Sequence, residues 1–167
     1  MARIASRIQP CLWFDTQAED AAQYYVGIFP NSRILSTAHY GEAGQEHHRM
    51  PVGSVMTVSF SLDGQPMLAL NGGPHFQFNP AVSLMVLCDS QAEIDHYWAA
   101  LGEGGDPGAQ QCGWLADRFG VSWQVTPRNW ERWMNAPDNA ASQRAMQAMH
   151  GMKKLDMAAL QAAFDGH

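Results

Sequence analysis

Apolar and polar residues along the chain follow two kinds of period, and each predicts its own kind of element. The apolar stretches 8–14 and 82–88 predict short strands, and each leads into a pattern of helical spacing, over 18–29 and 94–101 respectively. Alternation of apolar and polar residues over 54–62 is typical of a strand with one buried face. The chain therefore mixes strands and helices, and the order of strand followed by helix occurs twice.

The entry to the two helices has nearly the same sequence both times. Residues 15–20, DTQAED, recur as DSQAEI at 89–94. Each copy has the spacing of a capping box, in which a hydroxyl accepts from the backbone N–H three residues on and a carboxylate reaches back to the cap. We therefore predict that Thr16 and Ser90 cap the two helices, and we assign no catalytic role to the neighbouring carboxylates.

Further strands are predicted after each helix, so that a unit of one strand, one helix and three strands occurs twice. This βαβββ repeat predicts an α+β fold in which two curved, mixed or antiparallel sheets each bury one face. The stretch 106–111 is the weakest of the candidates. The predicted strands after the helices are 32–40, 54–62 and 65–71 in the first module, and 106–111, 113–117 and 121–126 in the second.

The length of 167 residues fits a single domain. We place module one at about 1–76, module two at about 77–127, and a helical C-terminal extension at about 128–167. Within the extension, Gly151 is expected to end one helix and Asp156 to cap the next. Its larger apolar residues are expected to pack rather than to bind a ligand. These residues are Met149, Met152, Leu160 and Phe164.

Charge and composition exclude several classes of protein. A formal net charge of −6 argues against a nucleic-acid partner, which requires a basic surface. The longest apolar run, 83–88, is far too short to cross a membrane, and the N-terminus lacks the apolar segment of a signal peptide. The three cysteines include no CxxC pair, which favours reduced thiols. We therefore expect a cytoplasmic protein with no membrane partner.

Three long stretches, 60–101, 112–127 and 145–156, carry a resemblance to a known family. The second of them is CGWLADRFGVSWQVTP. On these residues the sequence resembles the vicinal oxygen chelate (glyoxalase/bleomycin-resistance) superfamily, and within it the PhnB-like group named 3-demethylubiquinone-9 3-methyltransferase. The resemblance extends over essentially the whole chain. It implies a glyoxalase-like fold of paired βαβββ modules, commonly in a homodimer.

The resemblance also implies where a divalent metal would bind, with one ligand near each end of each module. Those positions fall at Gln9, near Ala69, at Ser83 and at Gln124. Two amides, a methyl and a hydroxyl supply neither the imidazole nor the anionic donors that such metals prefer. We therefore predict no metal, no cofactor, and none of the superfamily's metal-dependent chemistry.

Strand parity indicates which side chains would line a cavity instead. Alternate residues share one face of each predicted strand, and these faces are apolar and aromatic with a few neutral polar groups, as in small-molecule pockets. In the alternative, Gln9, Ser83 and Gln124 pair with one another inside a packed core. Trp114 and Trp123 are expected to be structural, although one indole is suited to stacking on a ligand. The candidate substrate-binding residues are Gln9, Cys11, Trp13, Ser83, Met85, Trp114 and Gln124.

No set of catalytic residues can be assembled from the sequence. His47, His48 and Arg49 lie in a glycine-rich loop, 41–53, that is either solvated or folds over the pocket as a lid. Cys11 is nucleophilic only beside a cation, and its strand carries none. Whether the protein is an enzyme therefore stays open.

The methyltransferase label has no chemical support in the residues. A methyl-donor site of Rossmann type needs a glycine-rich turn that opens a helix, whereas the glycine-rich stretch 102–108 follows one.

Three hypotheses about function remain. The first is a homodimeric, metal-free protein that binds an unknown small molecule, with no reaction assigned. The second is an enzyme that acts on a small electrophilic or quinone-like substrate through His47, Arg49 or Cys11. The third is a resistance-type protein that sequesters a flat, drug-like molecule without chemistry.

Overall fold

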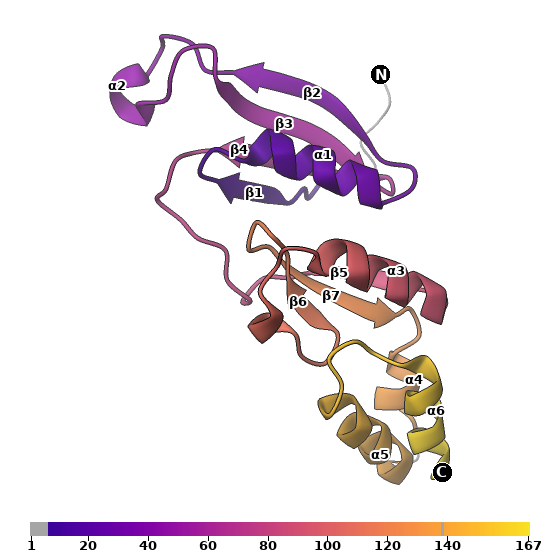
Figure 1. Cartoon of the computed structure of the whole chain (residues 1–167). Helices are drawn as coiled ribbons and strands as arrows, with labels where there is room; N and C mark the ends of the chain where they lie inside the picture. The colour runs from indigo at the N-terminus through magenta and orange to yellow at the C-terminus, as the bar shows by residue number, and fades with distance from the viewer. Residues whose placement is uncertain (1–6, 138) are drawn as a thin grey trace. The chain divides into compact units, whose positions relative to one another are not determined.

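A computed structural model describes residues 7–137 and 139–167 of the protein. The chain divides into two compact units, Met1–Phe78 and Asn79–His167. Each unit has its own sheet, with one long helix on a face of that sheet (Figure 1). The α+β class expected from the alternating patterns is confirmed, with two separate sheets and helices at the C-terminal end.

The first unit is a four-stranded sheet with the strand order β1-β4-β3-β2. Strand β1 pairs with β4 in parallel, and the other pairs are antiparallel. Its elements are β1 (Cys11–Phe14), α1 (Ala18–Ile28), β2 (Arg33–His39), α2 (Gln45–His48), β3 (Val55–Leu62) and β4 (Gln65–Asn71).

Helix α1 covers one face of this sheet because both surfaces present apolar residues at the right period. Alternate residues of β3, namely Val58, Phe60 and Leu62, are buried, as the alternation in the sequence predicts. The helix meets them with small alanines and the buried ring of Tyr25, which stacks on Phe60 at 6.5 Å between centroids. The opposite face of the sheet carries the half-buried residues of the same strands.

The start of α1 differs from the predicted capping box. The cap residue is Gln17, and its side chain makes no capping hydrogen bond. The N–H of Ala18 instead donates to Oδ1 of Asn71, 2.8 Å away at the end of β4. Asn71 is buried and also donates to the carbonyl of Val55 at 3.0 Å. A side chain from a distant strand thus takes the place predicted for Thr16.

The second unit begins with a three-stranded sheet of order β5-β7-β6. Strands β5 and β7 are parallel, and β6 is antiparallel to β7. Helix α3 begins at the predicted cap: Oγ of Ser90 accepts from the N–H of Glu93 at 3.2 Å, and the Glu93 carboxylate accepts from the N–H of Asp89 at 2.6 Å. The elements are β5 (Leu84–Cys88), α3 (Gln91–Gly102), η1 (Pro107–Ala109), β6 (Trp114–Ala116) and β7 (Ser122–Pro127).

The strand predicted over 106–111 is wrong, so in the described residues this module has three strands where four were expected. Residues Pro107–Ala109 form a short 3₁₀ helix instead. Asp106 accepts from the N–H of Gly108 at 2.8 Å, and Pro107 has no N–H to give to a neighbouring strand. An isolated antiparallel bridge pairs Gln111 with Trp114, the first residue of β6.

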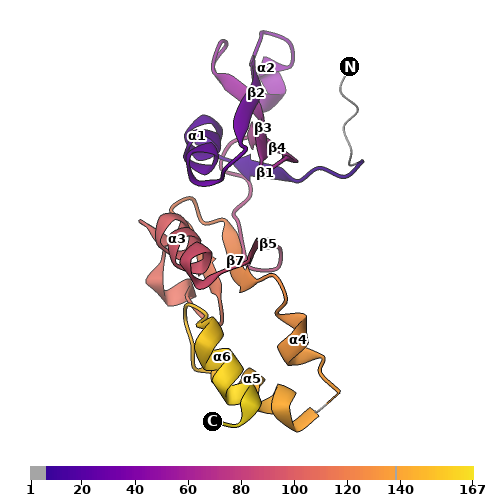
Figure 2. The ribbon, with the colours of Figure 1, turned by 90° about the vertical axis from the view of Figure 1, so that its right-hand side faces the viewer.

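The predicted helical extension is confirmed as α4 (Glu131–Met134), α5 (Asn139–His150) and α6 (Met157–Asp165). Gly151 follows the end of α5, and Oδ1 of Asp156 caps α6 by accepting from Ala159 at 2.9 Å. Helices α5 and α6 lie side by side (Figure 2).

These helices belong to the second unit. The N–H groups of Cys112 and Gly113 donate to the carbonyls of Met152 and Lys153 at 2.8 and 2.7 Å, which fastens the α5–α6 connection to the sheet. The side chain of Gln91 in α3 holds the same connection, donating to the carbonyl of Leu155 at 3.1 Å. In the described part of the chain no helix is long and apolar enough to cross a membrane.

Candidate functional site

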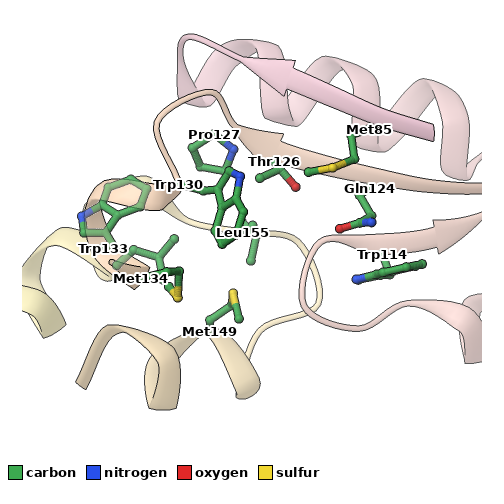
Figure 3. A pocket seen from close by; sticks show the side chains of 11 residues that line it. Met85, Trp114, Gln124, Thr126, Pro127, Trp130, Trp133, Met134, Met149 and Leu155 are labelled. Atoms are coloured by element: carbon green, nitrogen blue, oxygen red, sulfur yellow. The ribbon is translucent and has the colours of Figure 1, made fainter. Parts of the chain in front are cut away.

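The second unit holds a small, largely apolar pocket of about 130 Å³ between its sheet and its C-terminal helices. Figure 3 shows side chains from the sheet and from the C-terminal segment around this space, with Trp114 and Gln124 on one side and Trp133 and Met134 on the other. The sheet side consists of Met85, Trp114, Gln124, Thr126 and Pro127, and the remaining wall of Trp130, Trp133, Met134, Met149, Leu155 and Leu160.

Strand alternation explains why these sheet residues share a face. Val86 and Val125 are buried on the face covered by α3, so their neighbours in the chain point to the other face. Met85 is in register with Gln124, and Gln124 is in register with Trp114. The three side chains therefore form one row across the sheet, and the structure brings together three of the predicted binding residues.

Gln124 is oriented by Ser83. Its amide Nε2 donates to Oγ of Ser83 at 2.8 Å, so two of the three polar residues that the alternative interpretation paired with one another are in contact. Ser83 itself does not line the pocket. The amide oxygen of Gln124 and the hydroxyl of Thr126 make no hydrogen bond within the described residues, and both belong to side chains at the pocket wall. The site thus offers one fixed acceptor and one hydroxyl in apolar surroundings.

Trp133 is anchored in the helical wall by its neighbours. Its side chain is buried, its indole N–H donates to Oε1 of Gln161 at 3.1 Å, and the guanidinium of Arg132 lies 4.4 Å from its ring centroid. Arg132 also donates to the same Gln161 oxygen at 2.6 Å. Met134 and Met149, by contrast, are unbranched and adapt to the shape of a guest. The helical wall thus combines an anchored indole, that of Trp133, with the flexible side chains of Met134 and Met149.

The other predicted binding residues, Gln9, Cys11 and Trp13, lie in the first unit and are not among the residues that line this pocket. Gln9 is exposed ahead of β1. The indole N–H of Trp13 donates to the carbonyl of Gly73 at 2.9 Å, and its ring packs edge-on against Phe76 at 5.0 Å. Burial raises the pKa of the Cys11 thiol, which disfavours the thiolate that a nucleophile needs.

The positions implied for metal ligands do not form a cluster of metal-binding side chains. Ala69 is fully buried on the face of β4 that packs against α1, so this residue is one position out of phase with the open face, where Leu68 and Leu70 lie. Among residues 7–137 and 139–167, no three histidine, cysteine, aspartate or glutamate side chains come together as a metal site. Ser83 and Gln124, which do meet, are both neutral.

The histidine loop contains a one-turn helix, α2, rather than a purely extended segment. His48 serves the loop itself: Nδ1 of its ring accepts from the N–H of Met50 at 3.0 Å, and the ring packs on Tyr40 at 4.5 Å. His47 is exposed and lies 3.3 Å from the Glu46 carboxylate. Of the two histidines, His48 therefore has a structural task in holding the loop.

Sequence reasoning missed most of the helical wall. It named Met149 and Leu160 only as packing residues, and it named neither Trp130 nor Trp133. The available signal was the pair of tryptophans three residues apart, directly after a strand whose own face carries pocket residues.

Comparisons with known proteins point in one direction. A family model described as 3-demethylubiquinone-9 3-methyltransferase matches residues 6–126, which is most of the chain, but not the C-terminal helices that the resemblance led us to include. A PhnB protein from Bacillus cereus is 33% identical over 73% of this chain and 99% of that chain, with a TM-score of 0.62.

A second solved structure, of a protein from Pseudomonas aeruginosa, is 22% identical over 74% of this chain and 98% of that chain, with a TM-score of 0.57, and it supports the fold alone. No curated protein matches the sequence. The chain belongs to the PhnB-like family described as 3-demethylubiquinone-9 3-methyltransferase, and its fold is glyoxalase-like.

Proposed function

We propose that the second unit binds a small, planar, mostly apolar molecule in the pocket between its sheet and its C-terminal helices, and that binding needs no metal. The observation that carries the proposal is the composition of the wall, in which three indoles and three thioethers surround one amide and one hydroxyl. Pockets for small molecules have this composition, because apolar side chains supply affinity and a few polar groups fix orientation.

The volume limits the size of the ligand. A cavity of about 130 Å³ is close to the roughly 150 Å³ apolar cavity that stays free of water and takes up benzene. One six-membered ring with a short substituent therefore fits without rearrangement. A larger ligand requires movement of Met134 or Met149, because these unbranched side chains change rotamer at a lower free-energy cost than the indoles of the wall.

The polar groups select among single-ring molecules. Ser83 holds the Gln124 amide so that its oxygen remains an acceptor, and Thr126 supplies a hydroxyl that both donates and accepts. A phenol-type hydroxyl satisfies either group, whereas a plain hydrocarbon leaves both without a partner. We therefore expect phenol to bind more tightly than toluene, although toluene is the more apolar of the two molecules.

Neither metal-dependent chemistry nor methyl transfer is part of this proposal. The polar groups at the pocket are neutral oxygen and nitrogen donors, which bind divalent transition metals weakly. The glycine-rich segment that follows α3 contains the short helix η1 and does not open a long helix in the manner of a methyl-donor site.

We also propose that the protein is a homodimer, as the resemblance implies. The support is an apolar edge: β5 is an outer strand of its sheet, and its residues Met85 and Leu87 are 47% and 41% exposed. Analytical ultracentrifugation tests this proposal. A dimer that dissociates in Leu87→Glu supports it, and a monomer at all concentrations of the wild-type protein contradicts it.

Ligand binding is tested by thermal shift and tryptophan fluorescence with phenol, toluene and cyclohexanol. Phenol at about 100 times its dissociation constant adds about 2.7 kcal/mol to the stability of a protein that binds it only when folded. Thr126→Val removes the hydroxyl and keeps the shape, so phenol affinity falls by about three- to tenfold while toluene affinity changes little. Thr57→Val, in the first unit, is the matched control and leaves both affinities unchanged.

Two results would overturn the proposal. One is the absence of a saturable shift with every member of the panel. The other is the loss of binding after dialysis against a chelator and its return with added zinc, nickel, manganese or iron, which would contradict the metal-free part.

A further inference from the structure

A tight turn connects the 3₁₀ helix of the second unit to β6. The N–H of Trp114 donates to the carbonyl of Gln111 at 2.8 Å, and the N–H of Gln111 donates to the carbonyl of Trp114 at 3.1 Å. The two residues between them both have positive φ, 52° at Cys112 and 83° at Gly113. Asn-Gly is the usual pair for such a turn, because a side chain other than that of glycine or asparagine rarely adopts this conformation. A cysteine in the first position is unusual and projects its thiol from the tip of the turn.

An imidazole lies next to this thiol. Nδ1 of His150, the last residue of α5, is 3.8 Å from Sγ of Cys112, although the two residues are far apart in the sequence. The side chain of Gln111 joins them, since its Nε2 donates to the carbonyl of His150 at 2.8 Å and approaches Sγ of Cys112 at 3.5 Å. The backbone of Cys112 is fastened to the α5–α6 connection through Met152. Hydrogen bonds of Gln111 and of the Cys112 backbone therefore fix the positions of Cys112 and His150 relative to each other.

The other two thiols have no such partner. Cys88 is fully buried, and burial, followed by the nearby Glu93 and Asp89 carboxylates, raises its pKa to about 12. Cys11 is exposed but has no imidazole or cation in contact with its sulfur in the described structure. Cys112 is half-exposed, and His150 is exposed, so a dissolved reagent reaches both.

We propose that Cys112 and His150 form a thiol–imidazole pair that undergoes exchange with low-molecular-weight disulfides, which makes Cys112 a site of reversible modification. Nδ1 of His150 takes the proton of the Cys112 thiol, and the sulfur attacks one sulfur of the disulfide. A new S–S bond forms at Cys112 while the bond within the reagent breaks. The departing thiolate takes the proton from the imidazolium and leaves as a thiol, so the protein thiol is oxidised and half of the reagent is reduced.

This inference does not rest on the proposed ligand. The reacting atoms lie on the turn and at the end of α5, and neither Cys112 nor His150 lines the pocket. The two proposals can therefore fail separately.

The test is the rate of mixed-disulfide formation in the full-length protein near neutral pH, followed by intact mass and located by peptide mapping. Two reagents are used, glutathione disulfide and the uncharged 2-hydroxyethyl disulfide. Cys112 is expected to react at least about tenfold faster than Cys11, because His150 is in place to take its proton during the attack, whereas burial raises the pKa of the Cys11 thiol. His150→Gln lowers the rate at Cys112 with both reagents and leaves the rate at Cys11 unchanged.

His47→Gln, an exposed histidine of the first unit, is the matched control and changes neither rate. Thermal melting of each variant establishes that it is folded, and Gln111→Leu serves as a second probe, which should also slow the reaction at Cys112. Equal rates at Cys11 and Cys112 overturn the proposal, as does a rate at Cys112 that His150→Gln does not change. A loss confined to glutathione disulfide also overturns it, since His150 would then act only as a charge that attracts the anionic reagent.

Discussion

Leu160→Ala tests whether the C-terminal helices form a true core with the second sheet. Leu160 is 1% exposed and packs with Trp133, Ala145 and Leu155 in one cluster. The substitution removes three carbons from that cluster. At about 0.8 kcal/mol for each buried methylene, the lost transfer free energy is about 2.4 kcal/mol.

A further cost comes from the space left behind. Trp133 is held by its hydrogen bond to Gln161, and Leu155 lies in a connection that the backbone of the turn before β6 fastens, so neither is free to move in. Each cubic ångström of residual cavity costs about 24 cal/mol, which brings the expected total to roughly 3–4 kcal/mol.

The assay is urea unfolding followed by tryptophan fluorescence, in which Trp130 and Trp133 report on this cluster. Because the chain has two compact units, circular dichroism should be recorded as well, so that separate transitions are recognised. Val82→Ala is the control on the same unit: Val82 is 77% exposed, so its loss should cost less than about 1 kcal/mol.

The enlarged cavity gives a second measurement. Benzene should raise the melting temperature of Leu160→Ala by more than that of the wild type, because the variant has more empty apolar volume. A loss of stability below about 1 kcal/mol, with no gain from benzene, would refute the packing argument, since it means that Leu160 is not enclosed.

Three further substitutions test local features. Ser90→Ala should destabilise the protein by about 1 kcal/mol in chemical denaturation, whereas Thr16→Ala should change stability little, because only Ser90 caps its helix; equal losses contradict this. Cys112→Asn creates the Asn-Gly pair that the turn prefers and should raise stability by about 0.5–1 kcal/mol by calorimetry; a lower melting temperature contradicts it. Arg128 donates to Asp89 at 2.7 Å, and this hydrogen bond lowers the pKa of the Asp89 carboxyl from 3.8. The stability that this pair adds is present at pH values above the unfolded-state pKa of Asp89, and it is lost as pH falls through the lower pKa of the folded protein. The melting temperatures of wild type and Arg128→Met should therefore converge in acid. A difference that stays constant down to pH 2 argues against it.

The parts of the fold that the sequence predicts well are those set by neighbouring residues. Alternation placed the buried face of β3 correctly, and the Ser90 cap and the Asp156 cap depend on side chains within three residues of the N–H that they bind. The Thr16 cap failed for the opposite reason. Its sequence is as favourable as that of Ser90, but the helix begins one residue later than the box requires, at Ala18, and the N–H of Ala18 donates to Asn71, which lies far along the chain.

The site shows the same division between local and distant causes. Strand parity placed Met85 and Gln124 each on the face of its strand that lines the pocket, because parity is a property of each strand by itself. It did not reveal that Trp133 and Leu155 close the space above them, since this depends on how helices beyond the strand fold back. Nor did it reveal that the end of α5 brings His150 to Cys112.

The two walls of the pocket have different relations to the family. The sheet wall up to Thr126 lies within the residues 6–126 that the family model matches, whereas Pro127 and the wall from Trp130 onward lie beyond them. The polar groups that orient a ligand therefore belong to the matched part of the chain, as do Trp114 and Met85. The other two indoles and the other two thioethers, which close the space and limit its size, belong to the part outside it. Exchanging the helical segment between relatives should then change the size of the preferred ring compound, while substitution of Gln124 or Thr126 should change its preferred polar group.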